Sequence, residues 1–219
     1  MGVKPTIEEA RALVADAALW PRARDFLWDF APQIHPSWLE GLGLGGVPCL
    51  SSPRVKKFIL SSLGVESVFH AFPKEDWSRL LLLDGATLLE IAKWLGALAC
   101  AGSLRRVTDG KTVRALKAAL PGVYPEVFGF SVYFRRLEGL FGEASPRDAE
   151  GVVSAGMSIL DSLLAPLPGP LVSRLRLKLP GNLHDSVAPR EAKADPAVAG
   201  PALAKLLKLK FPEAHKLCC

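Results

Sequence analysis

The chain has 219 residues, of which 49% are hydrophobic and 22% charged, and its formal net charge is +5. A chain of this length can bury a core without a metal ion or a disulfide, and its apolar content excludes disorder over most of the sequence. Leu and Ala outnumber Val and Ile by 64 to 21. Because Leu and Ala favour helices, the composition predicts a mainly α fold, a single globular helical domain with at most a short strand near residues 174–179.

Capping residues, prolines and apolar spacing predict helices along the chain. The predicted helices are residues 6–18, 53–63, a short helix after Pro73, then 85–101, 110–120, most of 124–141, 146–165 and 201–211. The signals at their starts are Thr6, Ser52, Asp84, Asp109 and Asp148, and the signals at their ends include Pro21, Gly64 and Gly102. Residues 181–200 are rich in Gly, Pro, Asn, Asp and Ser, which predicts a loop.

No membrane span, signal peptide or targeting segment is expected. The longest uncharged part of the most apolar stretch, residues 94–104, is much shorter than the roughly 20 residues that cross a bilayer. The few cysteines include no CxxC, which suits a reducing compartment, and the isolated Cys49 and Cys100 are expected to be buried thiols. The adjacent Cys218 and Cys219 leave open a lipidation signal in a eukaryote.

Sequence motifs of catalysis are missing. The chain has no phosphate-binding GxxxxGK[ST], no GxSxG and no HExxH, and the Gly-rich residues 41–46 lack the spacing of a dinucleotide loop. His215 with Cys218 and Cys219 offers at most three ligands, whereas a structural zinc site takes four. We therefore expect no catalytic residue, no metal site and no cofactor, although a site assembled from distant residues remains an alternative.

Two segments stand out as candidates for partner binding. The first is Phe30–Leu39, in which two prolines and several large apolar groups form a compact run. Its candidate contact residues are Phe30, Pro32, His35 and Trp38. The alternatives are packing against a helix and a docking surface built on a rigid turn.

The second segment is the basic end, residues 174–219, which holds 9 basic and 4 acidic side chains and so carries the whole net charge. Residues 175–179 alternate apolar and basic side chains, which locally indicates a strand, although the choice between strand and helix stays open. On a strand, Arg174, Arg176 and Lys178 share one face, either a solvated edge or a binding face for an acidic partner. On the last helix, Lys205 and Lys208 lie opposite Leu203, Leu206 and Leu207.

Several short motifs in order resemble the YscK/SctK family, accessory proteins of bacterial type III secretion systems. They are the aromatic-x-Pro-x-x-His motif at residues 30–35, the LRLKLP run at 175–180, the amphipathic end at 203–212 and the order of helices between residues 80 and 124. The resemblance covers roughly residues 26–217. It divides the chain into an N-terminal helical extension, residues 1–25, and a helical domain, residues 26–219.

The resemblance implies a non-catalytic adaptor in the cytoplasmic sorting platform, peripheral at the inner-membrane base of the injectisome. The implied partners are the pod protein, which resembles the flagellar switch, and the cytoplasmic domain of the inner-membrane ring protein, with the stator and the ATPase attached indirectly. No nucleic acid is expected, but a basic nucleic-acid-binding protein and a small cytoplasmic enzyme remain alternatives. Reversing Arg174, Arg176 and Lys178 to Glu is expected to weaken an acidic partner and leave the fold intact.

Overall fold

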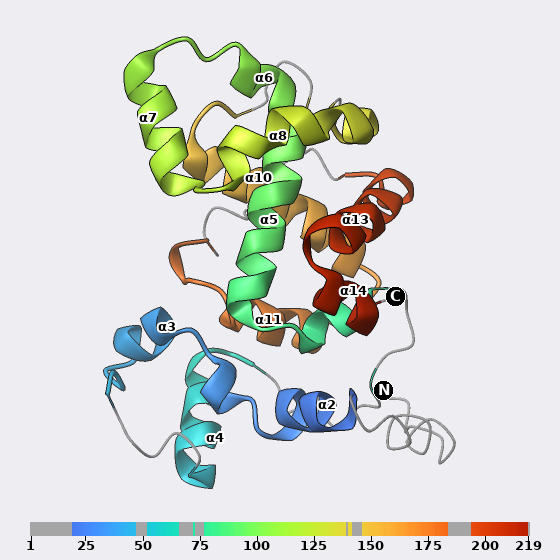
Figure 1. The fold of residues 1–219 in the computed structure, drawn as a ribbon. Coiled ribbons are helices and arrows are strands. Elements are labelled where there is room, and N and C mark those ends of the chain that lie inside the picture. The colour runs from blue at the N-terminus through green and yellow to red at the C-terminus, as the bar shows by residue number, and fades with distance from the viewer. Residues whose placement is uncertain are drawn as a thin grey trace. The chain divides into compact units, whose positions relative to one another are not determined.

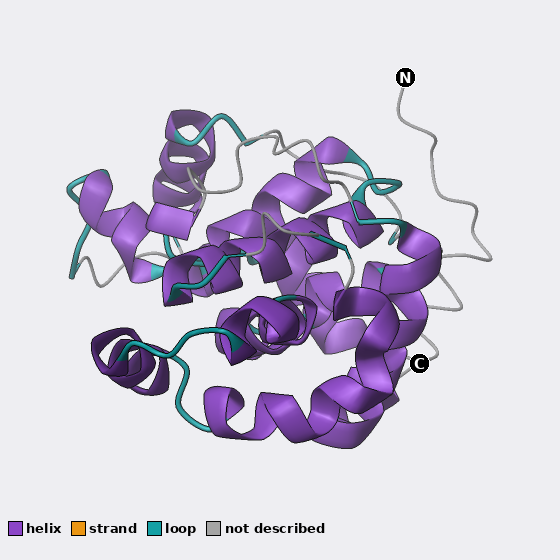
Figure 2. Cartoon of the chain, turned by 90° about the horizontal axis from the view of Figure 1, so that it is seen from above, coloured by secondary structure: helices purple, strands orange, loops and turns teal. Residues whose placement is uncertain are grey.

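The computed structural model describes residues 19–46, 52–65, 72, 77–138, 140–141, 146–183 and 194–218. In this portion of the chain all regular structure is helical and no strand occurs, which confirms the mainly α prediction (Figure 2). The described residues fall into two compact units. Unit 1 takes its residues from Met1–Gly85 and Pro166–His184, with Cys218, and unit 2 takes them from Ala86–Ala165 and Asp185–Leu217.

Unit 1 gathers the first helices and one helix from late in the chain (Figure 1). Its elements are α2 (Leu19–Trp28), η1 (Ala31–Gln33), α3 (Pro36–Gly41), α4 (Pro53–Ser62), η2 (Ser78–Leu82) and α11 (Gly169–Leu177). The 3-10 helix η2 packs against both α2 and α11. Phe26, Leu80 and Leu81 are fully buried, and so is Ile59 on α4.

Unit 2 holds the remaining helices. They are α5 (Gly85–Ala99), whose first residue belongs to unit 1, α6 (Ala101–Arg105), α7 (Gly110–Ala119), α8 (Val123–Ser131), η3 (Val132–Phe134), α9 (Arg135–Glu138), α10 (Ala149–Leu164), α13 (Pro196–Lys210) and α14 (Pro212–Cys218), whose last residue belongs to unit 1. The apolar faces of α5, α10 and α13 supply most of its core. Leu203, Leu206 and Leu207 are fully buried on α13, as their spacing predicts.

Local capping explains several helix starts. The Asp109 side chain accepts a hydrogen bond from the Thr112 N–H, and Asp148 accepts one from the Gly151 N–H, so each carboxylate caps the helix that follows it. Ser52 is the N-cap residue of α4 but its side chain forms no capping hydrogen bond, so Pro53 at the first helical position is the start signal that acts there. These starts are confirmed because they depend on contacts within four residues.

Helices α5 and α10 of unit 2 cross each other (Figure 1). Gly96 of α5 and Gly156 of α10 lie where the two backbones meet. A Cβ atom on Gly96 would lie 1.8 Å from the Val152 carbonyl oxygen, and one on Gly156 would lie 1.8 Å from that of Ala92. Any side chain at either position would therefore overlap the backbone of the facing helix. The absence of side chains lets the two helices approach to backbone contact, which offsets the poor helix propensity of glycine.

Four predictions of local structure are wrong. Residues 174–177 are helical rather than extended, and they end α11. Gly102 does not end the central helix, because α6 continues from Ala101 after a break at Cys100. Residues 196–200 are helical, since the Asp195 side chain caps the Ala197 N–H and Pro196 occupies the first turn of α13. Pro21 lies inside α2, which is not among the predicted elements, and the helix predicted at residues 6–18 lies outside the described residues.

Candidate interaction surfaces

Inside unit 1 the Phe30–Leu39 segment packs against the beginning of the basic end, residues 177–181. The His35 N–H donates to the Leu177 carbonyl over 2.8 Å, and the Trp38 Nε1–H donates to the Leu179 carbonyl over 2.9 Å. Leu177 is the last residue of α11, where helical carbonyls lack intrahelical donors, and Leu179 follows it by two residues. The Phe30–Leu39 segment therefore supplies donors to the end of a helix about 140 residues later in the chain.

His35 also fixes the start of α3. Its Nδ1 accepts from the Ser37 N–H at 3.2 Å and lies 2.9 Å from Ser37 Oγ, while Oγ accepts from the Gly181 N–H at 3.0 Å. In this chain of hydrogen bonds Nδ1 is an acceptor, so the proton of the neutral ring resides on Nε2. His35 is therefore a capping residue of α3 through its Nδ1.

Packing accounts for most of the apolar groups in the segment. Phe30 is buried and meets the Phe26 ring edge-on, with centroids 5.8 Å apart. Trp38 is half-buried against the end of α11, and Pro32 is exposed. The packing interpretation holds for Phe30 and Trp38, and the docking role of Pro32 stays a prediction.

Replacing Trp38 by Phe should lower the free energy of unfolding by about 1 kcal/mol, because the Leu179 carbonyl loses its donor while most of the ring volume is kept. Chemical denaturation followed by circular dichroism measures the change. Trp28→Phe is the matched control, since the Trp28 side chain is 48% exposed and its replacement should stay within about 0.5 kcal/mol. Equal stability of the Trp38 variant and the wild type would contradict the hydrogen bond between Trp38 and the Leu179 carbonyl.

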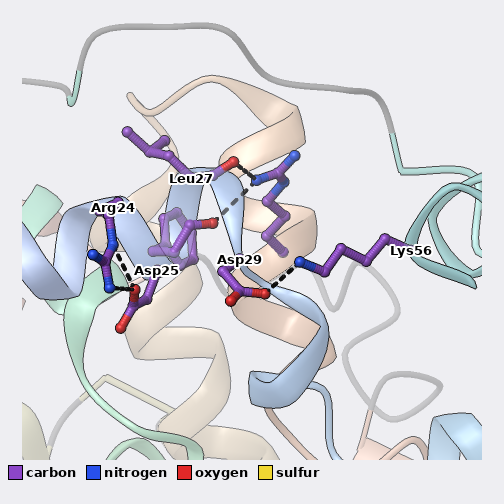
Figure 3. A network of polar contacts seen from close by, with 7 residues as sticks. Arg24, Asp25, Leu27, Asp29 and Lys56 are labelled. Carbon is purple, nitrogen blue, oxygen red and sulfur yellow. Dashed lines mark hydrogen bonds and ion pairs between the residues drawn. The ribbon is translucent and has the colours of Figure 1, made fainter. Parts of the chain in front are cut away.

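Arg174 closes the C-terminal end of α2. Its side chain is 3% exposed, and Nη1 donates to the carbonyls of Phe26 and Leu27 at 3.1 and 2.7 Å. Figure 3 labels Leu27, the second of these acceptors. The guanidinium carbon also lies 5.7 Å from the centroid of the Phe30 ring. Burial lowers the pKa of Arg174, but the contacts with α2 carbonyls and an aromatic face suit a cation.

Lys178, four residues after Arg174, has the same role at the end of η2. Its Nζ donates to the carbonyls of Leu81 and Leu83 at 2.7 and 2.9 Å and lies 4.7 Å from the centroid of the Phe26 ring. The side chain is 3% exposed. Burial lowers the pKa of Lys178 to about 7, and the nearby Asp84 carboxylate opposes that shift.

The predicted exposed face of Arg174, Arg176 and Lys178 is therefore wrong. On a helix Arg174 and Lys178 are spaced i, i+4 and lie on one side, which here contacts the ends of α2 and η2. Arg176 lies off that side and is half-buried. A period-2 pattern of only five residues is too short to distinguish a strand from the last turns of a helix.

Surface ion pairs surround the Arg174 site. Lys56 of α4 pairs with Asp29 at 2.6 Å, and Arg24 pairs with its neighbour Asp25 at 2.8 Å (Figure 3). Their carboxylates are 47% and 43% exposed, so each pair adds at most about 1 kcal/mol. The buried contacts of Arg174 thus dominate this network.

In unit 2 the predicted lysines Lys205 and Lys208 are exposed on α13, as the sequence pattern indicates. Lys205 Nζ lies 5.1 Å from the Tyr133 ring centroid and 5.6 Å from that of Phe134, and 3.4 Å from the Tyr133 carbonyl oxygen. A pocket of about 280 Å³ opens beside it, between η3–α9 and α13. Lys208 follows Lys205 by three residues on the same helix.

Sequence reasoning missed the other side of this pocket. Arg135 and Arg136 are exposed on α9, and the neighbouring Tyr133 side chain is 65% exposed. For Tyr133–Arg136 the sequence pattern predicts only that most of residues 124–141 is helical. A pair of arginines close after a tyrosine is a signal that can identify such a surface, because Tyr and Arg are frequent at protein interfaces.

Cys100 of unit 2 is fully buried. Burial raises the pKa of the Cys100 thiol to about 12, so it stays protonated and unreactive, and the expectation of a buried thiol is confirmed for Cys100 while Cys49 lies outside the described residues. In the portion of the chain that the structure covers, no three His, Cys, Asp or Glu side chains gather as metal ligands do. Within the same residues, every helix is too short or too polar to cross a bilayer.

Comparison with known proteins agrees with the motifs. The family model of YOP proteins translocation protein K (YscK) matches residues 25–219. No curated protein and no solved structure matches the chain. The matched region contains both interacting segments of unit 1 and the α13 surface of unit 2, so the resemblance carried by residues 30–35, 175–180 and 203–212 is confirmed. The chain belongs to the YscK family.

Proposed function

We propose that this chain is a non-catalytic adaptor of the cytoplasmic sorting platform of a type III secretion system. In this role it links the cytoplasmic domain of the inner-membrane ring protein to the pod protein, and the stator and ATPase attach indirectly. The observation that carries the proposal is the family match over residues 25–219, because the YscK family belongs to the type III secretion apparatus.

In this role the chain lies in the cytoplasm, peripheral at the inner-membrane base of the apparatus. The buried, protonated Cys100 and the capping role of His35 support an adaptor more than an enzyme. The positive charge of residues 174–219 is weak support for nucleic-acid binding. Two of its cations, Arg174 and Lys178, contact backbone carbonyls in the interior. Nucleic-acid binding depends on cations that reach phosphate groups.

An affinity-tagged full-length chain, expressed in its own source cells from its own locus, should recover both the pod protein and the inner-membrane ring protein. Deleting the gene should abolish export of the secreted substrates, and restoring the tagged chain should return it. Quantitative mass spectrometry of the recovered proteins and an assay of the culture supernatant measure the two effects. Recovery of neither partner, or normal export without the gene, would overturn the adaptor role.

A further inference from the structure

The pocket of unit 2 combines apolar walls with an open mouth. Its volume is about 280 Å³, and it lies between η3–α9 and α13, which pack against each other. Val132, Leu137, Val198 and Ala202 contribute apolar surface to its lining. Val132 is 55% exposed, although a large aliphatic side chain gains free energy from burial. A pocket of this kind accepts an apolar side chain from a binding partner.

The charged groups of the pocket all have one sign. Arg135, Arg136 and Lys205 line it, and none of the described residues that line it is acidic. Within the described chain Arg135 and Arg136 form no ion pair. The Lys205 ammonium lies over the Tyr133 and Phe134 rings, and it pairs with no carboxylate of the described residues. Three cations around an apolar pocket favour a partner that carries carboxylates.

Pro201 adds a backbone acceptor to this pocket. It lies inside α13 and has no N–H, so the Ala197 carbonyl four residues earlier lacks its usual helical donor. Both Ala197 and Pro201 line the pocket. A partner with a hydrogen-bond donor near its apolar side chain can satisfy this carbonyl.

The same side of α13 extends the surface beyond the pocket. Pro201, Lys205, Lys208 and Leu209 are exposed and spaced i, i+4, i+7 and i+8, which places them on one stripe of the helix. The stripe is about 12 Å long at 1.5 Å per residue. About two turns of helix that carry two cationic groups between two apolar ones match one face of an amphipathic helix laid alongside.

We propose that this α9–α13 surface, formed by Val132, Tyr133, Arg135, Arg136, Pro201, Lys205, Lys208 and Leu209, binds an acidic amphipathic helix of a protein partner. An apolar side chain of that helix enters the pocket, and its carboxylates contact Arg135, Arg136 and Lys205. The identity of the partner as a component of the secretion apparatus rests on the proposed function, whereas its acidic, helical chemistry rests on the surface itself.

The first test uses a defined probe, a fluorescein-labelled amphipathic peptide of 18 residues with Leu on one face and Glu on the other. Fluorescence anisotropy should show binding to the full-length chain, and Arg135→Glu/Arg136→Glu should weaken it at least tenfold. Tyr133→Ala should weaken it by a smaller factor. Raising the salt from about 50 to about 500 mM should also weaken it, because exposed ion pairs are screened.

The matched control is Lys111→Glu/Lys117→Glu, which makes the same change of charge on the exposed side of α7 in the same unit. It should bind the peptide as the wild type does, and circular dichroism should show that both double variants are folded. Equal binding of the Glu peptide by both double variants, equal binding of a Lys-for-Glu peptide, or no binding at all would overturn the proposal. The proposal would also be overturned if Arg135→Glu/Arg136→Glu abolished self-association or nucleic-acid binding but left binding of the Glu peptide unchanged.

A second test separates this surface from the adaptor role. The purified pod protein and the purified cytoplasmic domain of the ring protein are titrated against the same variants. If Arg135→Glu/Arg136→Glu loses binding to one of the two partners and the control variant keeps both, both proposals are supported. If the variant binds both partners as the wild type does, the proposed α9–α13 surface is wrong while the adaptor role stands. If the wild type binds neither partner, the adaptor role fails, and the peptide measurement by itself decides the surface.

Discussion

Replacing Gly156 by Ala is expected to lower the free energy of unfolding by about 3 kcal/mol or more, at or above the upper end of ordinary overpacking. The added Cβ would lie 1.8 Å from the Ala92 carbonyl oxygen and 2.9 Å from the Gly96 nitrogen. These are backbone atoms of the facing helix α5, so no side chain can rotate away to make room. Helices α5 and α10 must separate, and neighbouring side chains of the unit 2 core lose contact.

Gly129→Ala is the matched control for this prediction. Gly129 is inside α8, is exposed, and would have open space around an added Cβ. Alanine there should raise the stability by about 0.5–1 kcal/mol, because it reduces the conformational freedom of the unfolded chain. Chemical denaturation of both variants measures the difference. If Gly156→Ala is as stable as Gly129→Ala, the close crossing of α5 and α10 is incorrect.

Replacing Lys178 by Glu should destabilise the protein by about 3 kcal/mol or more, because a buried acceptor would face two carbonyls that lose their donor. In the wild type Nζ donates to the Leu81 and Leu83 carbonyls, and the side chain is 3% exposed. Lys208→Glu is the matched control, since Lys208 is exposed on α13 and should change the stability by no more than about 0.5 kcal/mol. Thermal or chemical unfolding of the two variants distinguishes them.

The pH dependence of stability gives an independent measure of the Lys178 site. The pKa of Lys178 is about 7 in the folded chain against 10.5 for an ordinary lysine. Between these values the unfolded chain binds the proton and the folded chain does not, so the free energy of unfolding should rise as the pH rises from about 7 to about 10.5. Lys178→Met should lack this rise, whereas Lys208→Met should keep it. A wild type without the rise, or a Lys178→Glu variant as stable as Lys208→Glu, would contradict the buried site.

The burial of Arg174 and Lys178 changes how a charge-reversal experiment is interpreted. Reversal of Arg174, Arg176 and Lys178 together is not expected to leave the fold intact, because two of these side chains cap helix ends in the interior. Loss of partner binding in such a variant would report unfolding of unit 1. The exposed Arg135 and Arg136 are better positions for testing a partner contact.

The capping residues made much of the helical structure predictable. Asp109 and Asp148 mark the starts of α7 and α10, and their carboxylates bond to N–H groups three residues later. The apolar spacing of Leu203, Leu206 and Leu207 also identifies the buried face of α13. These features were predictable because a cap or a helix face depends on residues within one or two turns.

The candidate surfaces were only partly predictable. Lys205 and Lys208 are exposed as the sequence indicates, whereas Arg135 and Arg136 join Lys205 at one pocket from more than sixty residues away in the chain. Helix α13 begins five residues before the predicted start at Pro201, because Gly200 and Pro201 by themselves indicate a break. Asp195 and Pro196 begin the helix earlier, and its apolar face packs against α10.

The sequence by itself determined the helical class, the starts of α4, α7 and α10, the apolar faces, the concentration of positive charge after residue 173 and the motifs that resemble the YscK family. Tertiary structure alone decided what the positive charges contact. Arg174 reaches the Leu27 carbonyl across 147 residues of chain, and Lys178 reaches the Leu83 carbonyl across 95. Whether a basic side chain faces solvent or caps a helix depends on which unsatisfied carbonyls the fold brings within about 3 Å, and that distance is set by packing between remote segments.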